Sequence, residues 1–484
     1  MNTIATRTGA LLAALLLTAC ADAAPAAGET EGVTLTVYNN NVALVREVRR
    51  LTVGPDGQVT FEDVARAIDP TTVRAGSLTD PTATLLEQNY QYDLADADSL
   101  LRKYLGLRIE VISADLAYSG TLLSFDDRTL VLNTDDGLVM VRRGDHLRDI
   151  RIGRLPEGLR VRPTLLWRMA GAAGGEHLME VTYLTDALSW QAAYTLTITD
   201  DDTATLSGWV SLDNRSGKTY RDATLKLVAG NVNRVEPPRA RRAVYARAEM
   251  MMAGGGAPNA APMAEQAFFE YHLYTLGRTT TLADNETKQL KLFTPVTGLS
   301  IARQLVYQPL GDFRYHLGGR YTDPGYGLRH GETQVDVVIE VPNTEANRLG
   351  IPLPAGPVRV YQPIDDGEGA IFLGAERIDH TPAGETLDLQ VGSTFDVVGE
   401  RRQAGFKIEK GRNWMQERIE IRLRNRKDEQ VTVRVKEPMY RWATWRLTAE
   451  SIDHTEVENR TVIWDVPVPA GKEAVLTYTV EYTW

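Results

Sequence analysis

Two histidines and two aspartates in a glycine-rich stretch are residues whose types could bind a metal ion. His316 and His330 lie in residues 311–331, near Asp312 and Asp323, and imidazole and carboxylate groups are common ligands of zinc. A metal site needs ligands that converge in space, and spacing along a glycine-rich stretch does not provide convergence. We therefore expect a solvated loop, and no metal ion or other cofactor.

Two further groups have side chains that could do chemistry. Asp365, Asp366 and Glu368 could act as the paired carboxylates of a glycosidase, but proline and glycine flank them, which is typical of a solvated turn. The thioethers of Met250–Met252 could bind copper(I), but no histidine accompanies them, so a linker is the simpler interpretation. The sequence also contains neither Gly-x-Ser-x-Gly nor His-Glu-x-x-His. It therefore indicates no catalytic residues.

Aromatic residues near the C-terminus suggest a binding surface. Five of the eight tryptophans lie at or after Trp414. If residues 439–446 form a strand, Tyr440 and Trp442 share one face and Trp445 lies on the other. Both faces are buried only if the strand is covered twice, so one aromatic group is a candidate surface for contact with a protein or a polysaccharide. Packing of these side chains in the core is the interpretation that the usual behaviour of large aromatic residues favours.

The single cysteine, Cys20, suggests a lipid anchor. It follows Arg7 and the apolar segment Ala10–Leu17, an arrangement typical of an export signal. We expect residues 1–19 to be a lipoprotein signal peptide, Cys20 to carry the lipid, and residues 20–32 to form a flexible tether. An ordinary secretory signal that is cleaved after Cys20 is the alternative.

The predicted address is the bacterial cell envelope. Ala21 follows the cysteine where an aspartate would favour the inner membrane, so we expect the outer membrane, with the protein facing the periplasm or the surface. One cysteine allows no disulfide within the chain. The net charge of −11 gives no electrostatic reason for nucleic-acid binding.

Alternating strand patterns with frequent turns predict an all-β fold. We expect an N-terminal β domain over residues 33–95 and a small SH3-like or Sm-like barrel over residues 96–155, where a short helix precedes several tightly turned strands. Residues 180–484 are predicted to form one or two immunoglobulin-like β-sandwiches. Residues 237–266 are rich in alanine, glycine, proline and methionine, and we interpret them as a disordered insertion.

The chain resembles bacterial proteins that carry the domain of unknown function 4139, which mucoidy inhibitor A-like proteins share. The residues that carry this resemblance are Thr36–Glu47, Trp190–Tyr194, Asp213–Ala223, Leu227–Gly230, Leu353–Gly356, Val358–Tyr361 and Tyr482–Trp484. The resemblance supplies no catalytic residues. The long coiled coil of the mucoidy-inhibitor type has no heptad pattern in this chain, so the resemblance does not extend to that insert.

Together these features predict a lipid-anchored envelope protein with a binding or scaffolding role, whose partner is a protein or a polysaccharide. An envelope hydrolase that acts on carbohydrate or peptide is one alternative. An outer-membrane β-barrel protein is another, because the last strand alternates apolar and polar residues and ends on Trp484. The sequence does not indicate an oligomeric state.

Overall fold

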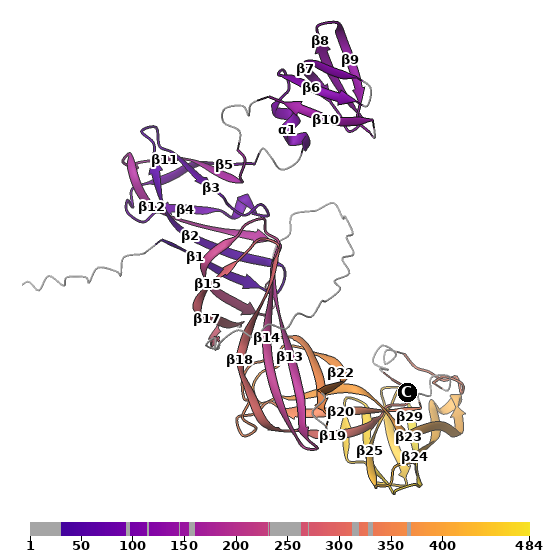
Figure 1. Cartoon of the computed structure of the whole chain (residues 1–484). Helices are drawn as coiled ribbons and strands as arrows, with labels where there is room; N and C mark the ends of the chain where they lie inside the picture. Colours follow the sequence, from indigo (N-terminus) through magenta and orange to yellow (C-terminus); the bar gives the residue numbers. More distant parts are fainter. Residues whose placement is uncertain are drawn as a thin grey trace, which may run out of the picture.

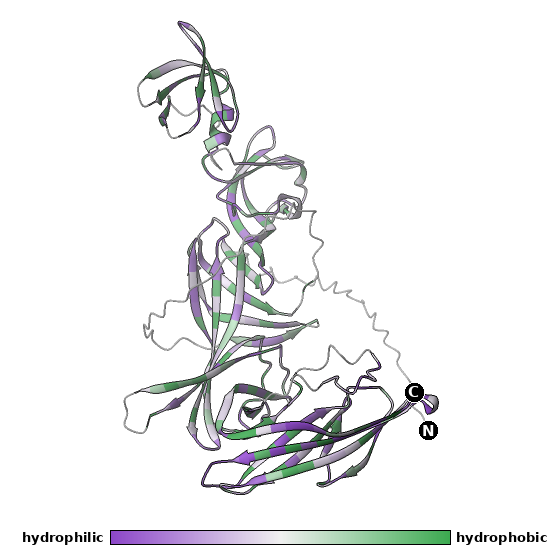
Figure 2. Cartoon of the chain, turned by 90° about the vertical axis from the view of Figure 1, so that its right-hand side faces the viewer, coloured by the Kyte–Doolittle hydropathy of each residue, from purple (hydrophilic) through white to green (hydrophobic). Residues whose placement is uncertain are grey.

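The computed structural model confirms the all-β class. It describes residues 31–92, 97–113, 116–144, 146–153, 160–230, 232, 263–269, 271–311, 319–327, 333–364 and 369–484. Within these ranges the strands form five sheets, and one α-helix is present (Figure 1). Hydrophobic and hydrophilic residues alternate along many strands, as expected for sheets with one buried face (Figure 2).

Two sheets combine N-terminal strands with strands from much later in the sequence. The seven-stranded sheet contains, in spatial order, β16 (Ala264–Phe268), β17 (Tyr271–Leu282), β15 (Tyr220–Ala229), β1 (Gly32–Tyr38), β2 (Val42–Val53), β12 (Gly175–Asp186) and β4 (Arg74–Ser77). The three-stranded sheet contains β3 (Gln58–Glu62), β11 (Thr164–Ala170) and β5 (Thr84–Gln91).

Residues 33–95, predicted to form a domain of their own, therefore share both sheets with later residues. Strand β1 pairs in parallel with β15, and β2 pairs antiparallel with β12. One continuous hydrophobic core reaches from Leu35 to Leu389. The alternating pattern of β1 and β2 predicts a buried face, but it does not indicate which strands lie beside them.

A small unit lies between β5 and β11 in the sequence. It contains helix α1 (Ala97–Lys103) and a five-stranded sheet in the order β10 (Leu147–Ile152), β6 (Arg108–Ser113), β7 (Ala117–Phe125), β8 (Thr129–Thr134) and β9 (Gly137–Arg142). A short helix precedes tightly turned strands, as the sequence predicts, and these elements enclose a separate hydrophobic core. The assignment of this unit as an SH3-like or Sm-like barrel remains a prediction.

The remaining strands form a five-stranded and a nine-stranded sheet. The five-stranded sheet is β18 (Glu286–Ser300), β14 (Thr203–Asn214), β13 (Leu188–Asp200), β21 (Gly356–Pro363) and β22 (Ala370–Ile378). The nine-stranded sheet is β26 (Trp445–Glu450), β29 (Glu473–Thr483), β24 (Trp414–Asn425), β23 (Thr386–Glu409), β20 (Gln334–Pro342), β19 (Ala302–Tyr307), β25 (Val431–Pro438), β28 (Thr461–Val468) and β27 (Glu456–Glu458).

The nine-stranded sheet folds back on itself, because β28 contacts both β24 and β29 although it is paired with neither. Its enclosed core includes Trp464, which is fully buried and stacks on Tyr478 with ring centroids 5.0 Å apart. Two short 3-10 helices, at Pro70–Thr72 and Lys410–Arg412, complete the described elements.

The predicted insertion at residues 237–266 needs a correction at its C-terminal end. Residues 237–262 lie outside the described residues. Met263 is buried, however, and residues 264–266 begin strand β16, which pairs with β17. The sequence did not predict this strand, because Ala264 and Gln266 have little β-propensity of their own. They are held in a strand by the pairing with β17.

Candidate functional site

Three tryptophans gather at one end of the nine-stranded sheet. Trp445 begins β26 and lies opposite Tyr482 of β29, Trp484 follows β29, and Trp442 lies three residues before Trp445. All three indoles are half-buried at the margin of the core. The guanidinium of the exposed Arg320 lies 5.9 Å from the ring centroid of Trp442 and 5.0 Å from that of Trp484. We call these four residues the tryptophan cluster.

The structure does not place Tyr440 on this surface. Its side chain is only 1 % exposed, and its hydroxyl donates a hydrogen bond of 3.0 Å to Glu417 Oε1. The prediction that Tyr440 and Trp442 share one face of a strand is wrong, because β25 ends at Pro438 and residues 439–444 form no strand. The chain leaves the sheet here, and the side chain of Arg441 turns inward to Glu417.

A buried ion pair fixes the loop that carries Arg320. Arg441 and Glu417 are 0 % and 1 % exposed, and two guanidinium N–H groups donate to the carboxylate at 2.9 and 3.0 Å. The same guanidinium donates to four backbone carbonyls of residues 321–326, at 2.8–3.3 Å. Each of these bonds has a charged donor, which makes them stronger than neutral hydrogen bonds. The loop is therefore fastened to the sheet, and Arg320 is held beside the indoles.

Asp323, one of the residues considered as a metal ligand, has a structural role in this loop. Its side chain accepts a hydrogen bond of 2.8 Å from the Gly325 N–H, and its backbone carbonyl accepts one of the Arg441 bonds. Among the described residues, no group of three or more His, Cys, Asp or Glu side chains is arranged to hold a metal ion. The other candidates, His316, His330, Asp312, Asp365, Asp366, Glu368, Met250–Met252 and the lipidation residue Cys20, lie outside the described residues.

A second ion pair lies deeper in the same core. Arg401 Nε donates to both carboxylate oxygens of Glu437, at 3.0 and 3.1 Å, and the hydroxyl of Tyr478 also donates to this carboxylate. Burial raises the pKa of Glu437, although the positive charge of Arg401 opposes this shift. Because neither charge reaches solvent, the pair links β23 to β25 rather than serving a ligand.

A third buried ion pair joins strand β2 to the connection between β14 and β15. Lys218 Nζ lies 2.6 Å from Glu47 Oε1 and donates a 2.6 Å hydrogen bond to the carbonyl of Asp63. The hydroxyl of Tyr183 donates to Glu47 at 2.9 Å, and Arg49 forms a further ion pair with it. Burial alone would raise the pKa of Glu47, but the charges of Lys218 and Arg49 outweigh it and lower this pKa. Glu47 is therefore ionised and fully paired.

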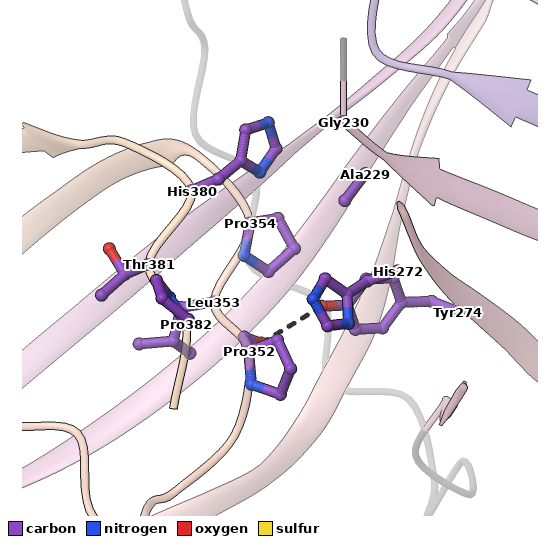
Figure 3. A pocket seen from close by; sticks show the side chains of 10 residues that line it. All are labelled: Ala229, Gly230, His272, Tyr274, Pro352, Leu353, Pro354, His380, Thr381 and Pro382. Atoms are coloured by element: carbon purple, nitrogen blue, oxygen red, sulfur yellow. Dashed lines mark hydrogen bonds between the residues drawn. The ribbon is translucent and has the colours of Figure 1, made fainter. Parts of the chain in front are cut away.

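A pocket of about 230 Å³ opens where β17 meets two proline-containing loops (Figure 3). Its lining residues are Ala229, Gly230, His272, Tyr274, Pro352, Leu353, Pro354, His380, Thr381 and Pro382. His272 contacts Glu265 of β16 at 2.7 Å, and Tyr274 donates to the carbonyl of Pro352 at 3.1 Å. His380 Nδ1 accepts a 3.2 Å hydrogen bond from the Ala355 N–H. Both imidazoles therefore have protein partners that hold the walls of the pocket together.

Protonation of His380, which lines the pocket, should make the stability of the folded protein depend on pH. Burial lowers the pKa of His380 and the charge of His272 adds to this effect, whereas Asp379 opposes it. The folded protein thus binds this proton less readily than the unfolded chain, so stability should fall as the pH drops below 6.5, the ordinary value. A His380→Gln variant should lose less stability than the natural protein over that interval.

Urea unfolding at a series of pH values, together with an NMR titration of the His380 ring, would check this expectation. The comparison between the two proteins isolates His380 from the other groups that titrate in this range. A ring that titrates at or above pH 6.5, or an identical pH dependence in the variant, would contradict the assignment.

These features define a multi-sheet, all-β protein in which buried ion pairs join distant parts of the chain and half-buried indoles lie at one end of the nine-stranded sheet. The family model described as domain of unknown function (DUF4139) matches residues 179–484. The match covers more than half of the chain, so the protein belongs to this family, in agreement with the resemblance of its sequence. A comparison with curated proteins gave no match.

The match begins inside β12, so it leaves out β1, β2 and β4, which belong to the same seven-stranded sheet. Among the described residues, the one α-helix is too short to cross a membrane.

Proposed function

We propose that this protein is a lipid-anchored protein of the bacterial cell envelope that binds a partner protein through the tryptophan cluster. The observation that carries the binding role is the exposed Arg320 beside Trp442 and Trp484, with the half-buried Trp445 at the same end of the sheet. The envelope address is supported by the sequence, in which Cys20 directly follows a short apolar segment.

The composition of the cluster favours a protein partner over a polysaccharide. Tryptophan and arginine are enriched where protein interfaces concentrate their binding energy. Arg320 is also held in place before a partner arrives, because Arg441 fixes the adjacent backbone. Such preorganisation reduces the entropy that binding would otherwise lose in ordering the loop.

A pull-down from crosslinked envelopes tests the binding role. The double variant Trp442→Ala/Trp484→Ala should recover at least about tenfold less partner, because truncation of a central interface tryptophan typically costs about 2 kcal/mol or more and about 1.4 kcal/mol corresponds to tenfold. Trp209→Ala is the matched control, since Trp209 is 39 % exposed on β14, outside the cluster. It should recover the partner as the natural protein does.

The same experiment includes a Cys20→Ala form, which should leave the membrane fraction. Mass spectrometry of the natural protein should show fatty acyl chains on Cys20. Unchanged recovery with the double variant would refute the role of the cluster. Capture of polysaccharide without protein would assign the cluster to glycan binding, and an unmodified N-terminus beyond residue 20 would refute the lipid anchor.

A further inference from the structure

The small unit has an open sheet edge at β9. In the described sheet β9 is the last strand and pairs only with β8. An open edge presents unpaired backbone groups, which proteins commonly shield with charges, bulges or a covering segment. Leu138 and Met140 of β9 are instead 69 % and 72 % exposed. An apolar edge of this kind is a surface to which another strand can be added.

The backbone of β9 shows which residues face this edge. The Arg143 N–H donates to the Arg128 carbonyl at 2.7 Å, directly beyond the pair Arg142↔Thr129. In an antiparallel ladder, residues bonded to the neighbouring strand alternate with residues whose N–H and C=O point away from it. Val139 and Val141 therefore bond to β8, whereas the backbone groups of Leu138, Met140 and Arg142 face outward.

The side chains on the exposed face of this edge have a self-complementary order. Leu138, Met140 and Arg142 of β9 are exposed at alternating positions, and the exposed Asp136 lies in the turn directly before β9, which begins at Gly137. If two copies of β9 pair antiparallel about Val139, Leu138 lies opposite Met140 of the second copy. The turn residue Asp136 then comes beside Arg142 of the second copy, so each copy contributes one acidic and one basic residue to two opposite-charge pairs.

We propose that β9 is a homodimerisation edge, at which a second copy of this chain adds in this register. The outward-facing backbone groups are those that the register requires, because residues 138 and 140 would form the hydrogen-bonded pairs. A two-fold interface uses the same surface on both subunits, so it must be complementary to itself. The acidic turn residue before β9 and the basic residue at the end of β9 meet this condition. A purely basic or purely acidic strand would instead encounter a like charge at one end.

Charge reversal on the full chain tests the proposal. Dimerisation is measured by sedimentation velocity from micromolar to near-millimolar protein concentrations, because so small a contact belongs to the weak class of interfaces. Asp136→Arg places two arginines opposite each other at each end of the paired strands, and Arg142→Asp places two aspartates there. Each single variant should weaken dimerisation by about tenfold, since two cross-strand pairs change from attractive to repulsive at up to about 1 kcal/mol each. The double variant Asp136→Arg/Arg142→Asp should restore it.

An equimolar mixture of the two single variants should also dimerise, because every charged pair in the mixed dimer is then complementary. Asp149→Arg is the matched control, since Asp149 is exposed on β10, at the opposite edge of the same sheet. It should dimerise as the natural protein does, and circular dichroism should show that all variants are folded. A monomeric natural protein, single variants that dimerise normally, or a double variant that stays monomeric would each overturn the proposal.

Discussion

Replacement of Arg441 by methionine should lower the free energy of unfolding by about 3–5 kcal/mol, the usual loss when one member of a buried ion pair is removed. The carboxylate of Glu417 would remain buried without its counter-charge. Four backbone carbonyls of residues 321–326 would also lose their donor. Urea unfolding followed by tryptophan fluorescence is a suitable measurement, because five of the eight tryptophans lie in or beside this sheet.

The double variant Glu417→Gln/Arg441→Met is the control for the buried charge. A neutral amide can still accept the hydrogen bond that the Tyr440 hydroxyl now donates to Glu417. This variant should therefore regain part of the stability that the single variant loses. An unchanged urea midpoint in Arg441→Met, or a double variant less stable than the single one, would show that the ion pair does not hold this region together.

Replacement of Lys218 by methionine should cost about 3 kcal/mol, the lower end of the range for a broken buried pair. Glu47 is fully buried and Lys218 is 3 % exposed, so no solvent can replace the lost ammonium. Arg49 remains paired with Glu47, which is why we expect the smaller loss. The change should appear as a lower thermal unfolding temperature, measured by calorimetry.

A Glu47→Gln/Lys218→Met double variant distinguishes the charge from the packing. If the unpaired carboxylate causes the loss, the double variant should be more stable than Lys218→Met alone. Equal stability of the two variants would assign the loss to the aliphatic part of the lysine and to its bond with the Asp63 carbonyl.

Local structure was largely predictable from the sequence, whereas strand partners were not. Helix α1 precedes the tightly turned strands of the small unit, as helical spacing and turn residues predict. The alternation in β1 and β2 likewise predicts their buried faces. Their neighbours β15 and β12 could not be predicted, because an alternating strand fits beside many others and one sequence contains no information on pairing.

The candidate site was predictable only in part. Trp442 and Trp445 are accessible at the sheet end, but Tyr440 is not, since the turn after Pro438 removes the alternation on which its placement depended. The sequence contains a pattern from which one of the buried ion pairs could have been predicted. Glu417 lies between Met415 and Ile419 at a core-facing position of an alternating strand, and such a position accepts a charge only with a partner. Arg441 could not be identified as that partner from the sequence.

The interleaved seven-stranded sheet also constrains the order of events in biosynthesis. Strand β1 is made early, but its parallel neighbour β15 follows only after the intervening chain has been translated, since Thr34 pairs with Thr224. Until then β1 and β2 lack the neighbours that cover their edges, and such long-range pairing slows folding and exposes the nascent chain to aggregation. A fragment that begins at Met179, where the DUF4139 match begins, would lack the two strands between β15 and β12 and would therefore leave the edges of both without their neighbours.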